Sequence, residues 1–198
     1  MANFWDKCAG IYDFLQTRIN GKVYDAMLEY IREEVPDGAD VLECAAGTGA
    51  ISLNIADKAN SLLCTDISSE MLDIARKNAQ HNNIHNIRFE LGDIMSAADG
   101  GRYDIVIAAN VLFFLDEPQE AVRVLCRAAK NGGKVIIPLF LLDGLNTLLR
   151  LYDIVGLRFK NVYNVRSYAD MLRGAVHGRM KIKLIRGRIP MAIAVIYK

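Results

Sequence analysis

Hydrophobic residues along this chain recur with two different spacings, which predict alternating helices and strands. Residues 21–34 place Val23, Met27 and Ile31 on one helical face, and Pro36-Asp37-Gly38 then ends the helix. Short apolar runs bounded by turn residues predict strands at 41–44, 62–65, 87–91, 103–109 and 134–138. Helical spacing between them predicts helices at 50–59, at 118–130, and from Ser68 or Ser69 to Asn78.

The order of these elements predicts the fold class. Strands that alternate with helices are typical of an α/β protein whose parallel sheet is covered on both faces. Residues 139–176 are predicted to form helices and loops, and two more apolar runs follow at 181–186 and 191–197. The turn between these runs is too short for a parallel crossover, so they predict an antiparallel hairpin. We therefore expect a doubly wound, mostly parallel seven-stranded sheet with a C-terminal antiparallel hairpin.

Composition and charge narrow the classes of function. With 198 residues, of which 52% are hydrophobic and 24% charged, the chain fits an ordinary soluble globular domain. A net charge of +1 gives no reason to expect a nucleic-acid partner. No apolar run approaches the ~20 residues of a membrane-spanning helix, and the first residues do not resemble a signal peptide. We expect a cytoplasmic protein without a membrane span.

Cysteine and histidine do not indicate a metal site. None of the four cysteines stands in a CxxC pair, and three of them lie in apolar segments, so we expect buried, reduced thiols. His81 and His85 are one helical turn apart, but the sequence offers no third ligand. We therefore predict no bound metal.

Residues 41–50 carry the strongest indication of function. A short apolar strand reaches Glu43 and gives way to a turn of small residues that contains Gly47 and Gly49. Because glycine has no side chain, the backbone of such a turn can lie very close to a ligand. At the end of a parallel strand and before a helix, this arrangement is typical of a nucleotide-type binding site.

Two nucleotide-binding motifs fit this turn poorly. A phosphate-binding GxxxxGK[ST] loop is excluded, because no Lys-Ser or Lys-Thr follows Gly49. A dinucleotide GxGxxG fingerprint that starts at Gly47 would have Ser52 in place of its third glycine, and Glu43 stands just ahead of the turn. An NAD(P)-dependent oxidoreductase is therefore only a weak alternative.

A third motif fits better. The run from Glu43 to Gly49 resembles the first motif of class I S-adenosylmethionine-dependent methyltransferases, in which an acid closes the first strand before a small-x-Gly-x-Gly turn. Asp66 closes the second predicted strand and Gly92-Asp93-Ile94 the third, as in that family. Phe4-Trp5-Asp6-Lys7, with Ala9 and Tyr12-Asp13, resembles the segment that covers the cofactor in many small members.

This resemblance extends over residues 4–197 and implies a Rossmann-like methyltransferase fold. It implies a single domain over residues 1–198, with an N-terminal lid and helix at 1–35. A substrate-cover insertion at 139–178 would precede the last pair of strands. One departure is visible, because Ala45 stands where family members usually carry glycine, and we expect it to be tolerated.

The resemblance also implies roles for individual residues toward S-adenosylmethionine. Asp66 would accept hydrogen bonds from the ribose hydroxyls, Asp93 would hold the adenine amine, and Glu43 would order the turn and the amino group. Tyr12 is the predicted catalytic residue, a phenol of the lid that closes near the transferring methyl group. The full predicted cofactor set is Tyr12, Glu43, Ala45, Gly47, Gly49, Asp66, Ile67, Met71, Asp93, Ile94 and Asn110.

Several of these residues also have purely structural interpretations. Met71 has the spacing of a core residue, and Asp66 could serve only to stabilise the following helix through its dipole. Tyr12 could pack the N-terminal helix onto the domain. Phe113 and Phe114, which follow the fourth strand, fit an apolar substrate pocket and an ordinary core equally well.

The implied reaction is an in-line displacement on the sulfonium methyl group, for which the protein supplies mainly geometry and a dry pocket. We expect a small-molecule acceptor, because no NPPY-like segment follows the fourth strand and no Pro-Cys nucleophile is present. A non-catalytic protein that binds S-adenosylmethionine or S-adenosylhomocysteine is the main alternative. Either a monomer or a homodimer is consistent with the sequence.

Overall fold

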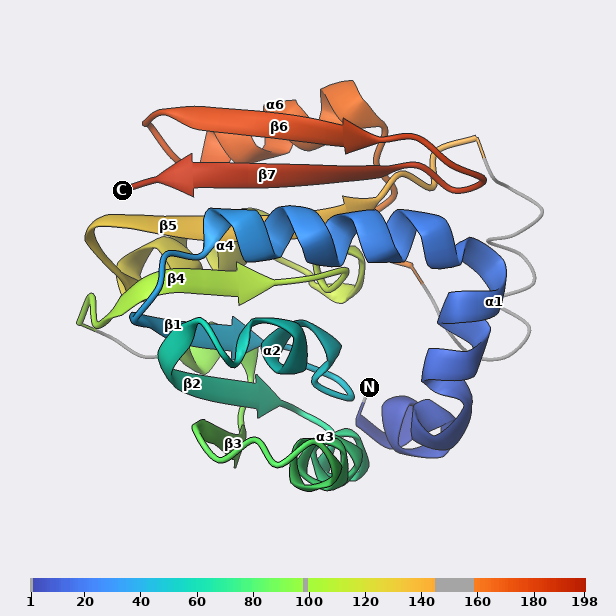
Figure 1. The fold of residues 1–198 in the computed structure, drawn as a ribbon. Coiled ribbons are helices and arrows are strands. Elements are labelled where there is room, and N and C mark those ends of the chain that lie inside the picture. The colour runs from blue at the N-terminus through green and yellow to red at the C-terminus, as the bar shows by residue number, and fades with distance from the viewer. Residues whose placement is uncertain (1, 98–99, 145–158) are drawn as a thin grey trace.

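The structure is a computed structural model that describes residues 2–97, 100–144 and 159–198. Within the first helix, it describes the side chains of residues 4–6, 9 and 20–34. One mixed sheet lies between two layers of helices (Figure 1), and the predicted α/β fold class is confirmed.

The described elements follow the predicted order along the chain. The helices are α1 (Ala2–Glu34), α2 (Ala50–Ile55), α3 (Ser69–His81), α4 (Pro118–Ala128) and α6 (Val165–Ala175), with short 3-10 helices η1 (Ile94–Ser96) and η2 (Leu112–Phe114). The strands are β1 (Ala39–Cys44), β2 (Ala59–Asp66), β3 (Ile87–Leu91), β4 (Tyr103–Ala108), β5 (Ala129–Phe140), β6 (Met180–Ile185) and β7 (Met191–Tyr197).

The sheet has seven strands in the order β3-β2-β1-β4-β5-β7-β6. Strands β1 to β5 pair in parallel, while β7 is antiparallel to both β5 and β6, so the predicted C-terminal hairpin is confirmed. The order reverses at β1, which lies between β2 and β4. In open sheets of this kind, ligands bind at the carboxyl ends of the strands beside such a reversal.

Each face of the sheet has its own core. Helices α1 and α2 cover one face, where Met27 and Ile31 are fully buried in one cluster with Ile105 of β4. On the other face α4 and α6 pack on β4 and β5, and the fully buried Tyr168 donates a hydrogen bond from its hydroxyl to the carbonyl oxygen of Ile137 (2.7 Å). The alternation of apolar residues along the strands fills both layers.

Helix α1 bends at Asn20, whose φ of −148° and ψ of 31° are not helical. The buried Asn20 side chain donates to the carbonyl oxygen of Ile189 (2.7 Å) and accepts from its N–H (3.5 Å). The bend turns the N-terminal half of the helix across the carboxyl edge of the sheet toward α3 (Figure 1). The prediction of a helix at 21–34 is correct for that range, but the helix begins at Ala2, because the β6–β7 turn holds the bend.

Several other predicted elements have different bounds in the structure. The helix predicted at 50–59 ends at Ile55, because Ala59 already pairs with β1. The helix predicted at 118–130 ends at Ala128, and the strand predicted at 134–138 runs from Ala129 to Phe140, so Asn131-Gly132-Gly133 lie inside β5. Gly132 has a φ of 83° where the register of β5 against β4 shifts, so the glycines allow an irregularity in a strand that pairs with β4 on either side.

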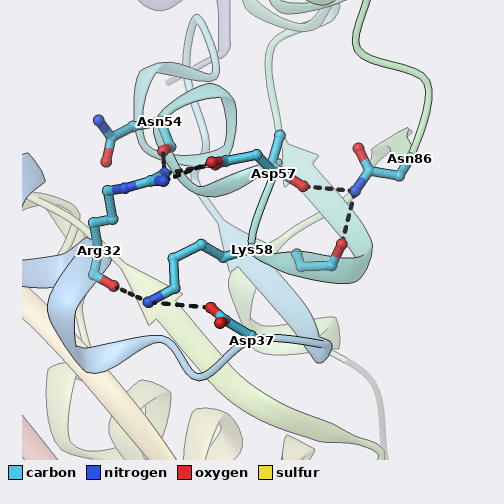
Figure 2. A network of polar contacts seen from close by, with 8 residues as sticks. Arg32, Asp37, Asn54, Asp57, Lys58 and Asn86 are labelled. Atoms are coloured by element: carbon cyan, nitrogen blue, oxygen red, sulfur yellow. Dashed lines mark hydrogen bonds and ion pairs between the residues drawn. The ribbon is translucent and has the colours of Figure 1, made fainter.

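At the amino edge of the sheet, polar side chains join the ends of several elements (Figure 2). Arg32 donates to both carboxylate oxygens of Asp57 and to the carbonyl oxygen of Asn54, each at 2.5 Å. Lys58 donates to the carbonyl oxygen of Arg32 (3.0 Å) and lies 3.6 Å from Asp37. These contacts join the end of α1 to the end of α2 and the start of β2.

Candidate functional site

A cavity opens at the carboxyl edge of the sheet, where β1 and β4 lie side by side. Its walls come from the segments that follow β1, β2, β3 and β4, and from the N-terminal half of α1. The cavity therefore lies at the reversal of strand order, where the topology predicts a ligand.

The turn after β1 has a left-handed backbone at alternate residues. The φ angles are 54° at Ala45, 56° at Gly47 and 81° at Gly49. A Cβ atom on Gly49 would lie 3.1 Å from the Cβ of Ala75, so glycine lets this turn pack against α3. Gly47 instead lines the cavity with open space around it. Ala45 adopts a conformation that costs L-residues roughly 1–2 kcal/mol, which explains why glycine is usual there in the family that this turn resembles.

Asp66 ends β2 and holds this turn in place. Its Oδ2 atom accepts from the N–H of Gly47 (2.8 Å) and its Oδ1 atom from the N–H of Ser68 (2.9 Å). The side chain is buried yet lines the cavity. Burial raises the pKa of Asp66 and the carboxylate of Asp6 adds to the rise, while the backbone hydrogen bonds oppose it.

Glu43 lies beneath the turn rather than in the cavity wall. It is 2% exposed, and its Oε2 atom accepts from the N–H of Ser52 (3.0 Å) and from the Ser52 hydroxyl. Burial raises the pKa of Glu43 to about 7; the charge of Asp66 adds to the rise, and the bonds from Ser52 oppose it. Glu43 thus joins the strand before the turn to the helix after it.

Asp93 and Asn110 lie at the rim, and both also make backbone contacts. The Asp93 carboxylate accepts from the N–H of Met95 (2.8 Å) and so caps η1. The Asn110 side-chain oxygen accepts from the N–H of Phe140 (3.0 Å), and the N–H of Asn110 donates to Pro138 (2.8 Å). Asn110 therefore links the ends of β4 and β5 while it lines the cavity.

Aromatic rings close one side of the cavity. Trp5 meets Phe114 edge to face at 5.4 Å between ring centroids, and Phe159 lies 5.3 Å from Phe113 and 5.2 Å from Phe114. Trp5 and Phe114 line the cavity, while Phe113 packs behind them in the core. Phe113 is thus a core residue, and Phe114 belongs to the same core while it also lines the cavity.

The chain that follows residue 158 is anchored beside these rings. The N–H groups of Lys160 and Asn161 both donate to the carbonyl oxygen of Phe113 (2.8 and 3.0 Å). The side chain of Asn161 donates to Leu115, which also lines the cavity (2.7 Å). Part of the predicted substrate cover at 139–178, residues 145–158, lies outside the described residues.

The structure brings most of the predicted cofactor residues together. Glu43 and Gly49 lie behind the cavity wall, and the side chain of Tyr12 lies outside the described residues. The predicted residues that line the cavity are Ala45, Gly47, Asp66, Ile67, Met71, Asp93, Ile94 and Asn110.

Sequence reasoning left out several residues of the wall. Ala109 and Val111 flank Asn110, Leu115 follows Phe114, and Gly92 precedes Asp93, so the position of each next to a residue singled out in the sequence was the available signal. Trp5 was assigned to a covering segment only, because nothing in the sequence shows which of its side chains reaches the site.

The cavity fits an adenosyl ligand by its chemistry. A carboxylate at the end of β2 suits a ribose diol, and the apolar side chains of Ile67, Met71 and Ile94 suit a flat base. The open space at Gly47 admits a ligand close to the backbone. Among the described lining residues there is no lysine or arginine, as suits a ligand without phosphate.

Other candidate chemistry is limited in the parts of the chain that the structure describes. There, no group of three or more His, Cys, Asp and Glu side chains is placed to hold a metal ion. The described cysteines are free thiols, and burial raises the pKa of Cys44 to about 12 and that of Cys126 to about 11. In residues 2–97, 100–144 and 159–198, no helix is both long and apolar enough to span a bilayer.

Comparison with known proteins finds that this chain is similar to methyltransferases. A family model described as a methyltransferase domain matches residues 41–133. The chain is 28% identical over 153 residues to ubiquinone biosynthesis O-methyltransferase of Coxiella burnetii, covering 74% of this chain and 63% of the relative. It is 27% identical over 171 residues to tRNA/tmRNA (uracil-C(5))-methyltransferase of Sulfurimonas denitrificans, covering 78% of this chain and 46% of the relative. The chain thus spans less than two thirds of the length of these curated relatives.

The fold agrees with these matches. A solved SAM-dependent methyltransferase of Thermotoga maritima, described as a possible histamine N-methyltransferase, superimposes with a TM-score of 0.76 over 100% of both chains, at 18% identity. The segment matched by the family model carries the turn after β1 and the acids that follow β2 and β3. Residues 41–133 therefore match a methyltransferase domain, and the fold of the chain is that of the solved SAM-dependent methyltransferase.

Proposed function

We propose that this protein transfers a methyl group from S-adenosylmethionine to a small-molecule acceptor. The observation that carries the proposal is Asp66, a buried carboxylate that lines the cavity and is held by the N–H groups of Gly47 and Ser68. S-adenosylmethionine supplies an already activated methyl group when it is bound. The protein therefore needs to bind, orient and exclude water rather than to provide a strong base.

The chain's own residues divide this work. Asp66 accepts hydrogen bonds from the ribose hydroxyls, and Asp93 at the rim receives the adenine amine. Ile67, Met71 and Ile94 surround the adenine with apolar surface. The backbone of the turn at 45–49 lies against the methionine part, and Glu43 keeps that turn in register through Ser52.

The acceptor side of the site is apolar. Val111, Phe114 and Leu115 line it, and such a wall excludes water from the reacting atoms. Residues 1–35 serve as lid and helix, and residues 139–178 cover the substrate, within one methyltransferase domain over residues 1–198. Tyr12 of the lid is the candidate for contact near the methyl group.

The names of the relatives support two acceptor classes. The Coxiella burnetii relative is a ubiquinone biosynthesis O-methyltransferase, which favours a small molecule. The Sulfurimonas denitrificans relative acts on tRNA, but the net charge of +1 gives this chain little general attraction for a phosphate backbone. We therefore favour the small molecule and keep RNA as an outcome of the test.

The first experiment is calorimetry with S-adenosylmethionine, S-adenosylhomocysteine and NAD(H). We expect both sulfur compounds to bind and NAD(H) to give no heat of binding. Absence of binding by S-adenosylhomocysteine would overturn the proposal. Binding of NAD(H) alone would favour an oxidoreductase.

The second experiment measures release of S-adenosylhomocysteine from S-adenosylmethionine in the presence of phenols, carboxylic acids, amines and unmodified tRNA. Turnover with one of the small molecules is the expected result. Turnover with tRNA alone would move the proposal to an RNA substrate. Binding without turnover in any of these mixtures would leave a non-catalytic binding protein as the function.

A further inference from the structure

The N-terminal half of α1 lies across the carboxyl edge of the sheet, and we call residues 2–19 the strap. Figure 1 shows the strap running from the bend at Asn20 down to α3. Its described side chains are those of Phe4, Trp5, Asp6 and Ala9. Ala9 is 5% exposed, so the strap is packed against other parts of the protein at this residue.

Asp6 attaches the strap next to Asp66. The hydroxyl of Ser68 donates a hydrogen bond to the Oδ1 atom of Asp6 at 2.5 Å. Ser68 is fully buried, and its side-chain oxygen also accepts from the N–H of Met71 as the N-cap of α3. Ser68 in turn donates its own N–H to Asp66. The strap is therefore joined, through the buried Ser68, to the carboxylate assigned to the ribose.

Trp5 stands one residue before this attachment and lines the cavity. Its indole contacts the ring of Phe114 edge to face, so both its backbone neighbour Asp6 and its ring are held. Met71 and Ile94 line the same cavity. If Asp66 holds a ribose, the base attached to that ribose lies among these side chains, because the glycosidic bond keeps base and sugar adjacent.

We propose that Trp5 forms the outer wall of the adenine slot and that Asp6 positions it there through Ser68. This inference rests on the proposed function and adds the strap to the cofactor site. A flat indole stacks well on a flat base, and this stacking contributes binding free energy without requiring hydrogen bonds to the base. The strap therefore contacts the adenosyl end of the cofactor, while the acceptor lies on the side of the cavity lined by Phe114.

The chain offers a direct optical test, because Trp5 is its single tryptophan. Tryptophan emission is recorded while the protein is titrated with S-adenosylhomocysteine, with adenosine and with methionine. We expect the first two ligands to change the emission and methionine to leave it unchanged. A response to methionine but not to adenosine would overturn the proposal, because Trp5 would then face the amino-acid end.

Variants test the energetic contribution. Base–aromatic stacking corresponds to roughly a 10-fold change in dissociation constant, so Trp5→Leu should weaken binding of S-adenosylhomocysteine about 10-fold by calorimetry. Phe89→Leu is the matched control, since Phe89 is a half-buried aromatic residue of β3 beneath Arg76 and outside the cavity wall. We expect the control to bind as the wild type does.

Two variants of Asp6 separate positioning from charge. Asp6→Asn keeps an oxygen that accepts from Ser68, so its affinity should stay within about 2-fold of the wild type. Asp6→Ala removes that acceptor and should weaken S-adenosylhomocysteine binding about 5-fold. In Asp6→Ala, the change of tryptophan emission on adding adenosine should also become smaller, because the indole is no longer held at the slot.

The outcomes distinguish this inference from the proposed function. If calorimetry shows no binding of S-adenosylhomocysteine to the wild type, the proposed function fails first. If the wild type binds it while tryptophan emission stays constant and Trp5→Leu binds equally well, only the inference about the strap fails. Equal loss of affinity in Asp6→Asn and Asp6→Ala would contradict the positioning role of Asp6.

Discussion

The carboxylates at the two edges of the sheet have different hydrogen-bond partners, which are lysines at the amino edge and neutral groups at the carboxyl edge. At the amino edge Glu34 accepts from Lys134 (3.0 Å) and from Lys181 (2.5 Å), and Lys130 lies between Asp104 (3.0 Å) and Asp40 (3.4 Å). At the carboxyl edge the buried carboxylates Glu43 and Asp66 receive hydrogen bonds from neutral groups only, among the residues that the structure describes.

The pKa values follow this difference. Burial pushes the pKa of Glu34 upward, but the hydrogen bonds from Lys181 and Lys134 outweigh burial and lower it. Burial raises the pKa of Glu43 to about 7 and also raises that of Asp66, with no cation beside them in the described chain. The charges of the amino edge thus stabilise the fold, while at the carboxyl edge the carboxylate of Asp66 is buried without a cation and lines the cavity.

The largest effect on binding is expected at Asp66. Asp66→Ala removes the carboxylate proposed to accept from both ribose hydroxyls, and charge-assisted hydrogen bonds of this kind correspond to a loss of about 3 kcal/mol or more in binding. It also removes the acceptor of two backbone hydrogen bonds, so the variant should be less stable as well. S-adenosylhomocysteine should therefore bind at least about 100-fold more weakly by calorimetry. Asp73→Ala is the control, an exposed residue of α3 paired with Arg76, and should not alter binding. Comparable losses in both variants would mean that a disturbed α3, not the carboxylate, explains the result.

The next effect is a pH dependence of stability at Glu43. Its folded pKa of about 7 is above its ordinary value of 4.5, so the folded protein holds this proton more tightly than the unfolded chain does. The contribution of Glu43 to stability should be complete below about pH 4.5 and should be lost as pH rises through about 7, a change on the order of 3 kcal/mol from this group. Urea unfolding of the wild type and of Glu43→Gln across this range measures the difference, because the glutamine cannot titrate. Parallel stability curves for the two proteins would refute the assignment.

At the amino edge we expect a change in stability without a change in ligand affinity, and a pH dependence opposite in sign to that of Glu43. Glu34→Ala should lower the free energy of unfolding by about 2 kcal/mol, because it leaves Lys134 and Lys181 without their shared carboxylate. Since the pKa of Glu34 is lowered, its contribution is present above about pH 4.5 and is lost as pH falls through the folded pKa. Affinity for S-adenosylhomocysteine should not change, and the exposed neighbour Glu33→Ala should leave stability within about 0.5 kcal/mol. A weaker cofactor affinity in Glu34→Ala would show that the two edges are coupled.

The smallest effect concerns backbone strain at the carboxyl edge. Ala45→Gly should stabilise the protein by about 0.5–1 kcal/mol, because glycine adopts the φ of 54° without steric penalty but loses more entropy on folding. Ala46→Gly in the same turn should destabilise it, since Ala46 does not have a positive φ. Thermal unfolding of the two variants measures both signs. Destabilisation by Ala45→Gly would show that the methyl group of Ala45 contributes packing that outweighs its strain.

Much of the candidate site could be predicted from the sequence because its residues follow strand ends. Asp66, Asp93 and Asn110 come directly after apolar runs, and parallel strands bring such residues to one edge of a sheet. Gly47 and Gly49 were assigned the same role, yet one faces the cavity and the other packs on Ala75. That difference depends on how α3 packs against the turn, which no local pattern records.

The sequence by itself determined the alternation of strands and helices, the terminal hairpin and the acids at the strand ends, because periodicity and turn chemistry act between neighbours in the chain. Only the tertiary structure decided that α1 continues to Ala2 and bends across the carboxyl edge, and that Trp5 reaches the cavity. The reason is that these features depend on contacts between distant residues. Asn20 is held by Ile189, and Asp6 is held by Ser68.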